Sequence, residues 1–144
     1  MREIRTEIEI DAPADAVWQV LTDFTAFPEW NPFIRSAEGA LVAGEHIAVT
    51  LQPPGHKATS FRPALLSVEP ARGFRWLGHV GMPGIFDGEH IHEIEPLGPR
   101  RSRYVQREQF HGVLVPFFGG MLRDAERGFG EMNAALKARV EAAS

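Results

Sequence analysis

Apolar and polar residues alternate over the first ten positions of the chain, which predicts a strand with one buried face. Asp11–Pro13 then predicts a helix start, because Asp caps helices and proline is tolerated in the first turn. The aromatic segment Asp23–Phe33 contains two prolines, which break any long helix. We therefore expect two short helical pieces after the first strand.

The middle of the chain predicts six further strands. Two lie between Arg35 and Leu51, one spans Lys57–Val68 and one spans Phe74–Val80. Pro63 interrupts the third of these, which predicts an edge or a bulge there. The last two strands form a hairpin within Gly84–Gly112. Because the links are too short for crossovers, the sheet is expected to be antiparallel.

A long amphipathic helix is predicted at the C-terminus. From Phe118 to Val140, apolar residues recur at spacings of three and four, which indicates a helix of roughly 20 residues with one apolar stripe. Gly128 weakens this helix, but a small residue also allows close approach by another group. A single seven-stranded sheet must cover one face, and only this helix is long enough. The expected fold is α+β, in one domain spanning residues 1–144.

The hairpin carries polar residues on the face that should be buried. A turn centred near residue 99 places His90 opposite Glu108 and His92 opposite Gln106. The preceding turn places Trp76 beside His90. Even-numbered positions of the hairpin then face the long helix, because the odd-numbered set is mostly charged.

Several interpretations of His90 and Glu108 remain open. The two side chains satisfy each other and hold the strands together, or they anchor the polar end of an apolar ligand. Alternatively, His90 acts as a general base or acid. A metal site would use His90, His92 and Glu108, but nothing else in the sequence argues for a metal. No metal or cofactor is therefore expected.

Composition excludes several classes of function. The 144 residues are 44% apolar and 24% charged, and the net charge is −4 with scattered basic residues, so a nucleic-acid partner is not expected. The absence of cysteine excludes disulfides and thiolate catalysis. No apolar run approaches the roughly 18 residues of a membrane span, and the N-terminus lacks an apolar signal-peptide region. We expect a cytoplasmic protein; a monomer and a homodimer are equally compatible with the sequence.

Seven short motifs together resemble the START/Bet v 1-like (SRPBCC) superfamily, in its polyketide cyclase/dehydrase-like branch. They are Ile10–Pro13, Val17-Trp18, Leu21–Asp23, Phe27–Pro32, Arg75–Gly78, Phe86–His90 and Glu108–Leu114. The resemblance covers the whole chain. It implies a helix-grip fold, in which a curved seven-stranded antiparallel sheet wraps around the C-terminal helix and an apolar cavity.

The resemblance implies binding of a small hydrophobic or aromatic molecule of lipid or polyketide type. One alternative is an enzyme resembling polyketide cyclase/dehydratases, with His90 and Glu108 as the acid–base pair. Another is a protein-interaction module like the Hsp90-activator branch, working through the outer face of the sheet. The residues expected to line the ligand site are Trp30, Phe33, Arg62, Trp76, Phe86, His90, His92, Tyr104, Gln106, Glu108, Phe110, Phe118, Met121, Leu122 and Phe129.

Overall fold

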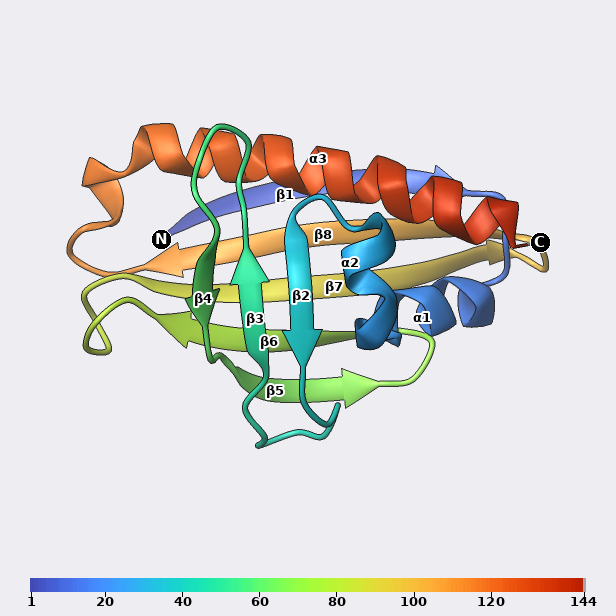
Figure 1. The fold of residues 1–144 in the computed structure, drawn as a ribbon, viewed down its shortest axis with the longest axis horizontal. Helices are drawn as coiled ribbons and strands as arrows, with labels where there is room; N and C mark the ends of the chain where they lie inside the picture. Colours follow the sequence, from blue (N-terminus) through green and yellow to red (C-terminus); the bar gives the residue numbers. More distant parts are fainter. Residues whose placement is uncertain (144) are drawn as a thin grey trace.

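The computed structural model describes residues 1–143, in which eight strands and three α-helices form (Figure 1). Strand β1 (Arg2–Ile10) precedes α1 (Ala14–Thr22), the 3-10 helix η1 (Phe24–Ala26) and α2 (Phe27–Trp30). The remaining strands are β2 (Ile34–Glu38), β3 (Ala48–Leu51), β4 (Thr59–Phe61), β5 (Ala64–Glu69), β6 (Gly73–His79), β7 (Asp87–Gly98) and β8 (Arg101–His111). The 3-10 helix η2 (Val115–Phe117) leads into α3 (Gly119–Ala142). The strand, short-helix and long-helix order confirms the predicted α+β helix-grip fold.

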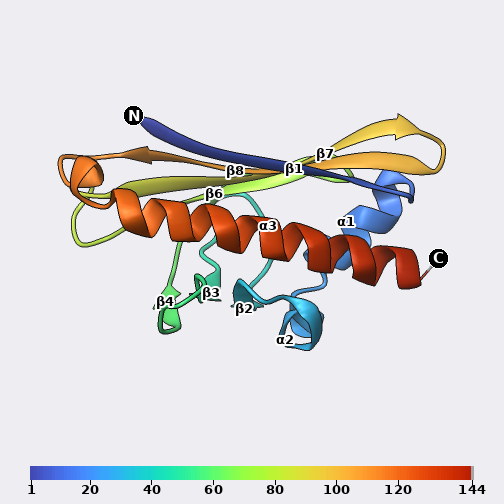
Figure 2. The same ribbon diagram turned by 90° about the horizontal axis from the view of Figure 1, so that it is seen from above.

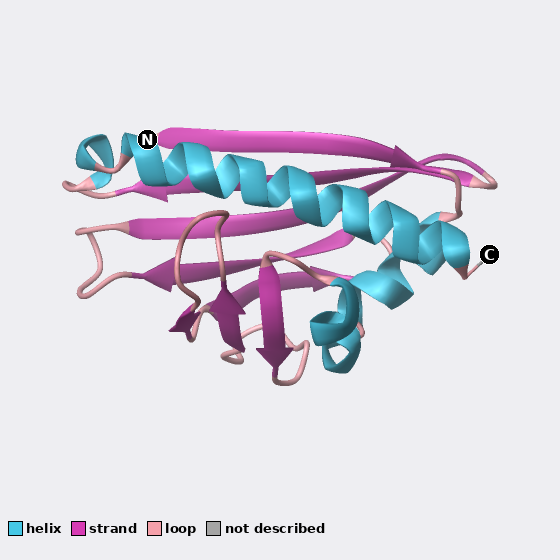
Figure 3. Ribbon diagram, turned by 45° about the horizontal axis from the view of Figure 1, so that its top comes forward, coloured by secondary structure: helices cyan, strands magenta, loops and turns pink. Residues whose placement is uncertain are grey.

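The eight strands form two separate antiparallel sheets. The large sheet has the order β1-β8-β7-β6-β5, and the small one has the order β2-β3-β4. The strands of the small sheet cross in front of those of the large sheet (Figure 1). Both the small sheet and α3 lie on the same face of the large sheet (Figures 2 and 3). The core is therefore enclosed by the large sheet on one side and by α3, the short helices and β2–β4 on the other.

The strand predicted over Lys57–Val68 is two strands. The chain bends at Arg62–Pro63, so that β4 pairs with β3 while β5 pairs with β6. Proline has no N–H to donate to a ladder, which explains a break at this position. The result is eight strands in two hydrogen-bonded sheets, where seven strands in one sheet were expected. Backbone hydrogen bonds from Ile47 to Pro63 and from Leu65 to Glu45 still join the two parts.

The predicted register of the hairpin is confirmed. His90 pairs with Glu108, His92 with Gln106, and Trp76 with His90. Even-numbered positions face inward, and both histidines and Gln106 are buried. The structure therefore brings polar side chains of β7 and β8, with Trp76 of β6 beside them, beneath α3. Among residues 1–143, no helix combines the length and apolar character needed to cross a bilayer.

Candidate functional site

Four aromatic rings stack in a column through the core, from β6 across β7 to α3. Phe74 stacks on His92 with 4.6 Å between ring centroids, His92 on His90 at 4.3 Å, and His90 on Phe129 at 4.8 Å. Trp76 packs edge-on against both imidazoles. Both faces of the His90 ring are thus covered, and only its edge is available for polar contacts.

A closed set of hydrogen bonds holds the edge of His90. Its Nε2 atom lies 2.8 Å from Oε1 of Gln106. Nε2 of Gln106 donates to Oδ1 of Asn133 on α3 (2.9 Å), and Nδ2 of Asn133 donates to the hydroxyl of Thr6 on β1 (2.9 Å). The Thr6 hydroxyl donates to the backbone carbonyl of Gln106 (3.1 Å). One network therefore joins β7, β8, α3 and β1.

The backbone carbonyl at the end of this network fixes its direction. A carbonyl oxygen only accepts hydrogen bonds, so the Thr6 hydroxyl donates its single proton to it. The same hydroxyl must therefore accept the hydrogen bond from Asn133. Asn133 then presents its Oδ1 to Gln106, and Gln106 presents its Oε1 to His90. It follows that neutral His90 carries its proton on Nε2. Its Nδ1 atom is left with a lone pair.

Glu108 faces that lone pair without hydrogen bonding to it. The distance from Nδ1 of His90 to Oε1 of Glu108 is 3.7 Å, too long for a hydrogen bond. Burial lowers the pKa of His90 from 6.5 to about 4, and the hydrogen bond that His90 donates to Gln106 offsets only part of this shift. Burial also raises the pKa of Glu108 from 4.5 to about 8. At pH 7 both groups are therefore mostly in their neutral forms, and the contact is not an ion pair.

The carboxyl group of Glu108 lies in an aromatic setting with partial access to solvent. Its side chain is 17% exposed and makes no hydrogen bond to any other residue from 1 to 143. It lies directly over Gly88, where a Cβ atom would come within 2.2 Å of Oε2. Phe110 borders the same position and packs on Phe86. Gly88 therefore leaves the room that this carboxyl group occupies.

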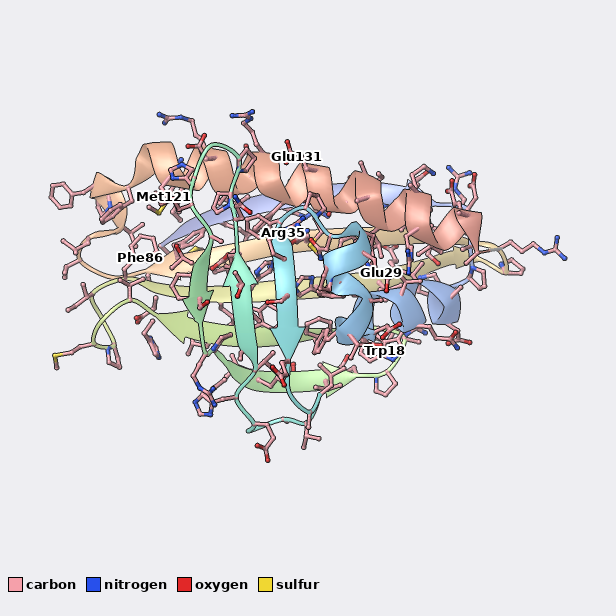
Figure 4. The ribbon with its side chains drawn as sticks, in the orientation of Figure 1. Trp18, Glu29, Arg35, Phe86, Met121 and Glu131 are labelled. Atoms are coloured by element: carbon pink, nitrogen blue, oxygen red, sulfur yellow. The ribbon has the colours of Figure 1, made fainter. Side chains whose placement is uncertain are left out.

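The neighbouring end of the molecule is apolar and partly open. Phe86 packs edge-to-face on Phe118, which precedes α3, and Met121 in the first turn of α3 is exposed. Figure 4 places Phe86 and Met121 at the same end of the fold, with Trp18 and Glu29 toward the other end. The structure thus brings the predicted residues Phe86, Phe110, Phe118 and Met121 into one region.

His92 and Tyr104 lie deeper in the core. Nδ1 of His92 lies 2.5 Å from the Tyr104 hydroxyl, and its Nε2 has no partner among the described residues. Burial, followed by the neighbouring His90, keeps the pKa of His92 well below its usual value, and burial raises the pKa of Tyr104 well above its own. No three His, Asp or Glu side chains of residues 1–143 gather in a geometry that could hold a metal ion.

The space beside His90 toward α2 and β2 is filled by Phe33. Its ring lies 5.4 Å from that of Phe129, edge to face, and 6.4 Å from that of His90. It rests on Gly128 of α3, where a Cβ atom would come within 2.5 Å of the ring. Leu122, also on α3, is buried in the same core. These predicted lining residues are therefore core residues, and Gly128 permits the close approach expected of a small helical residue.

Two predicted residues lie apart from this group. Arg62 is exposed between β4 and β5, and it borders a surface pocket of about 730 Å³ together with Ser60 and Pro28. The bend at Pro63 turns it out of the interior, so the inward orientation expected from alternation does not occur. Trp30 packs edge-to-face on Phe27, and its Nε1 is buried without a partner among the described residues.

The outer face of the large sheet, on which the interaction-module alternative depends, is covered with paired charges. Arg75 pairs with Glu89 and Arg107 with Glu93. A pocket of about 540 Å³ lies beside them, over β5, β6 and β7. These pairs balance positive and negative charges across neighbouring strands on that face.

Sequence reasoning missed Asn133, Thr6 and Gly88. Asn133 is 2% exposed and lies four residues after Phe129 on the apolar stripe of α3. A polar residue within an apolar stripe is a signal that could have identified it. Thr6 gave no such signal, because threonine is common in strands.

Comparison with known proteins finds a matching family model and several similar solved structures. The model of the polyketide cyclase/dehydrase and lipid transport family matches residues 1–141. A search of curated proteins finds no match. A START superfamily protein from Mycobacterium smegmatis has a similar structure, with a TM-score of 0.76, 22% identity and 99% of each chain covered.

Two similar structures are enzymes by name. The Zhui aromatase/cyclase from Streptomyces sp. R1128 has a TM-score of 0.77 at 17% identity, covering 97% of this chain and 93% of that one. A norcoclaurine synthase from Thalictrum flavum has a TM-score of 0.73 at 18% identity, covering 99% and 96%. At these identities the likeness shows the fold, and the family match over residues 1–141 shows the family. The chain belongs to the polyketide cyclase/dehydrase and lipid transport family.

Proposed function

We propose that this protein binds a small hydrophobic or aromatic molecule between the large sheet and α3, with Glu108 at the polar end of the site. The observation that carries the proposal is the free carboxyl group of Glu108, which is partly accessible and is bordered by the aromatic ring of Phe110. Leaving a desolvated polar group without a partner costs about 1–3 kcal/mol. A ligand that brings one polar atom and an apolar body to this position recovers that cost.

The arrangement of the neighbouring end supports an entry route there. Phe86 and Phe118 are partly exposed, and Met121 is 45% exposed. Methionine side chains adapt to irregular ligands. The family description includes both polyketide chemistry and lipid transport, which agrees with an apolar ligand. The proposed ligand therefore lies along the first turns of α3 and reaches inward to Glu108.

Native mass spectrometry of protein purified from its own host tests the proposal by detecting a co-purified ligand. Titration with N-phenyl-1-naphthylamine adds a second measurement, because its fluorescence rises in apolar sites. We expect saturable one-to-one binding, weakened at least about tenfold by Met121→Glu. The matched control, Met82→Glu, alters another exposed methionine and should leave binding unchanged. Absence of both a co-purified ligand and saturable dye binding would contradict the proposal.

Acid–base catalysis is the second candidate, because a specific observation favours it. Glu108 holds a proton at neutral pH and has a pKa of about 8, which suits a general acid. His90, with a pKa of about 4, is a weak base at the same pH. Glu108 is therefore the better candidate for proton donation to a substrate carbonyl. A polyketide-type substrate consumed by wild type and not by Glu108→Gln, with ligand affinity retained, would establish the enzyme.

A further inference from the structure

The inward end of the site offers one donor and one acceptor that are both uncharged. The acceptor is Nδ1 of His90, whose lone pair is fixed by the hydrogen-bond direction running from Gln106 to Thr6. The donor is the protonated carboxyl group of Glu108. Nδ1 of His90 and Oε1 of Glu108 lie 3.7 Å apart. A single oxygen atom can lie about 2.8 Å from each of them, because 3.7 Å is less than the combined length of two such bonds.

We infer that the ligand carries a hydroxyl group on an aromatic or enolic carbon, bound between Glu108 and His90. A hydroxyl oxygen accepts from Glu108 and donates to Nδ1 of His90, so one atom satisfies both groups. A carboxylate has no proton to donate and would place a charge against the His90 lone pair. An ammonium group cannot accept. This inference rests on the proposed function and names the chemistry of its ligand.

The surroundings of Glu108 favour a neutral aromatic partner. On β1 its register partner is the apolar Ile4, and on β7 the titratable group facing it is His90. Arg2 of β1 and Arg123 of α3 both reach Gly119 at this end, and neither lies within ion-pair distance of Glu108. Among residues 1–143, no cation therefore lies within ion-pair distance of Glu108 to hold a carboxylate ligand at that point. Phe86, Phe110 and Phe118 supply the aromatic surface.

Four probes of similar size test the inference: 2-naphthol, 2-methoxynaphthalene, naphthalene and 2-naphthoate. Their affinities are measured by displacement of N-phenyl-1-naphthylamine at pH 6.5. The methoxy compound accepts a hydrogen bond but cannot donate one, and naphthalene does neither. We expect 2-methoxynaphthalene to bind roughly three- to tenfold tighter than naphthalene, and 2-naphthol to bind tighter again by a similar factor. We expect 2-naphthoate to bind more weakly than 2-naphthol.

Glu108→Leu provides the matched variant, since it replaces a carboxyl group in apolar surroundings with an apolar side chain of similar size. It should remove the advantage of 2-methoxynaphthalene over naphthalene and leave naphthalene affinity within about twofold. In wild type, that advantage should also shrink as the pH rises from 6.5 to 9, because the donor proton of Glu108 is lost. Neither 2-methoxynaphthalene nor naphthalene titrates, so the pH effect belongs to the protein.

The outcomes separate the inference from the proposed function. Equal binding of 2-methoxynaphthalene and naphthalene, or tightest binding of 2-naphthoate, would overturn the inference and leave the proposed apolar ligand site standing. An unchanged preference in Glu108→Leu would overturn it as well. Failure of all four probes to bind would overturn the proposed function and the inference together.

Discussion

The imidazole of His90 is held by Gln106, whose Oε1 lies 2.8 Å from its Nε2 atom. Glu108, its directly opposite neighbour in the sheet, lies 3.7 Å from the other ring nitrogen and makes no hydrogen bond to it. The side-chain amide of Gln106 thus determines the tautomer of His90. Glu108 is not needed to hold the His90 ring, so its carboxyl group remains free to contact a ligand at the edge of the site.

Replacing Gln106 by Leu should destabilise the protein strongly. The change leaves the Nε2–H of His90 and the Oδ1 of Asn133 buried without partners, at about 1–3 kcal/mol each. We expect a loss of about 2–6 kcal/mol in the free energy of unfolding, measured by urea denaturation. Gln109→Leu is the control, because Gln109 bonds to Glu3 on the outer face and should cost about 1 kcal/mol or less. Equal effects of the two changes would contradict this account.

Stability should fall as the pH rises from 6.5 to 8. Native Glu108 keeps its proton up to about pH 8, whereas the unfolded chain loses it near 4.5, so rising pH favours unfolding across that range. His90 acts in the opposite sense, since its pKa is lowered from 6.5 to about 4 and it destabilises the fold only as the pH falls through that window. The two oppose each other below 6.5. Between pH 6.5 and 8 only the Glu108 effect remains, and it lowers the free energy of unfolding by about 2 kcal/mol.

The variant Glu108→Gln separates this effect from those of other titrating groups. Urea denaturation at half-unit pH intervals should show wild type losing stability between pH 6.5 and 8.5, with a clearly shallower slope in the variant. Parallel curves for the two proteins would show that Glu108 titrates normally in the folded state.

The register of the hairpin could be predicted because strand alternation and a short turn determine it locally. The register shift in this strand pair lies between Pro96 and Gly98, beside the turn, so it does not disturb the pairing of His90 with Glu108. The choice of Gln106 over Glu108 as the partner of His90 was not predictable in this way. It depends on Asn133, which reaches the site from a helix 27 residues further along the chain.

The break in the strand at Pro63 shows a second limit. Proline marks an interruption, which the sequence revealed, but its consequence depends on pairing with a distant segment. Residues 44–47 bond to residues 63–65, and this contact turns the chain from one sheet to the other. The same turn removes Arg62 from the interior. The alternation of apolar and polar residues therefore cannot predict which way a side chain points beyond such a bend.

Gly128→Ala and Gly130→Ala should have opposite effects on stability. At Gly128 a Cβ atom would come within 2.5 Å of the buried ring of Phe33, whereas nothing lies within 4 Å of one at Gly130. Alanine favours a helix by about 1 kcal/mol over glycine, so Gly130→Ala should stabilise the protein by up to that amount. Overpacking at Gly128 costs about 1–3 kcal/mol and should outweigh the gain. Thermal unfolding compares the two, and equal stabilisation would mean that Phe33 moves freely.

Gly88→Ala tests whether the position of the Glu108 carboxyl group matters for the site. A Cβ atom at Gly88 would come within 2.2 Å of Oε2 of Glu108, so the carboxyl group must swing away, which a flexible side chain can do at small cost in stability. Moved toward water, Glu108 should titrate nearer the ordinary carboxyl pKa, because burial is what raises it. Carbon-13 NMR of the Glu108 carboxyl group measures this shift directly. Gly98→Ala, on the same strand with open space around it, is the control and should leave the titration of Glu108 unchanged. If Gly88→Ala also leaves it near 8, the glycine does not create the space in which Glu108 is buried.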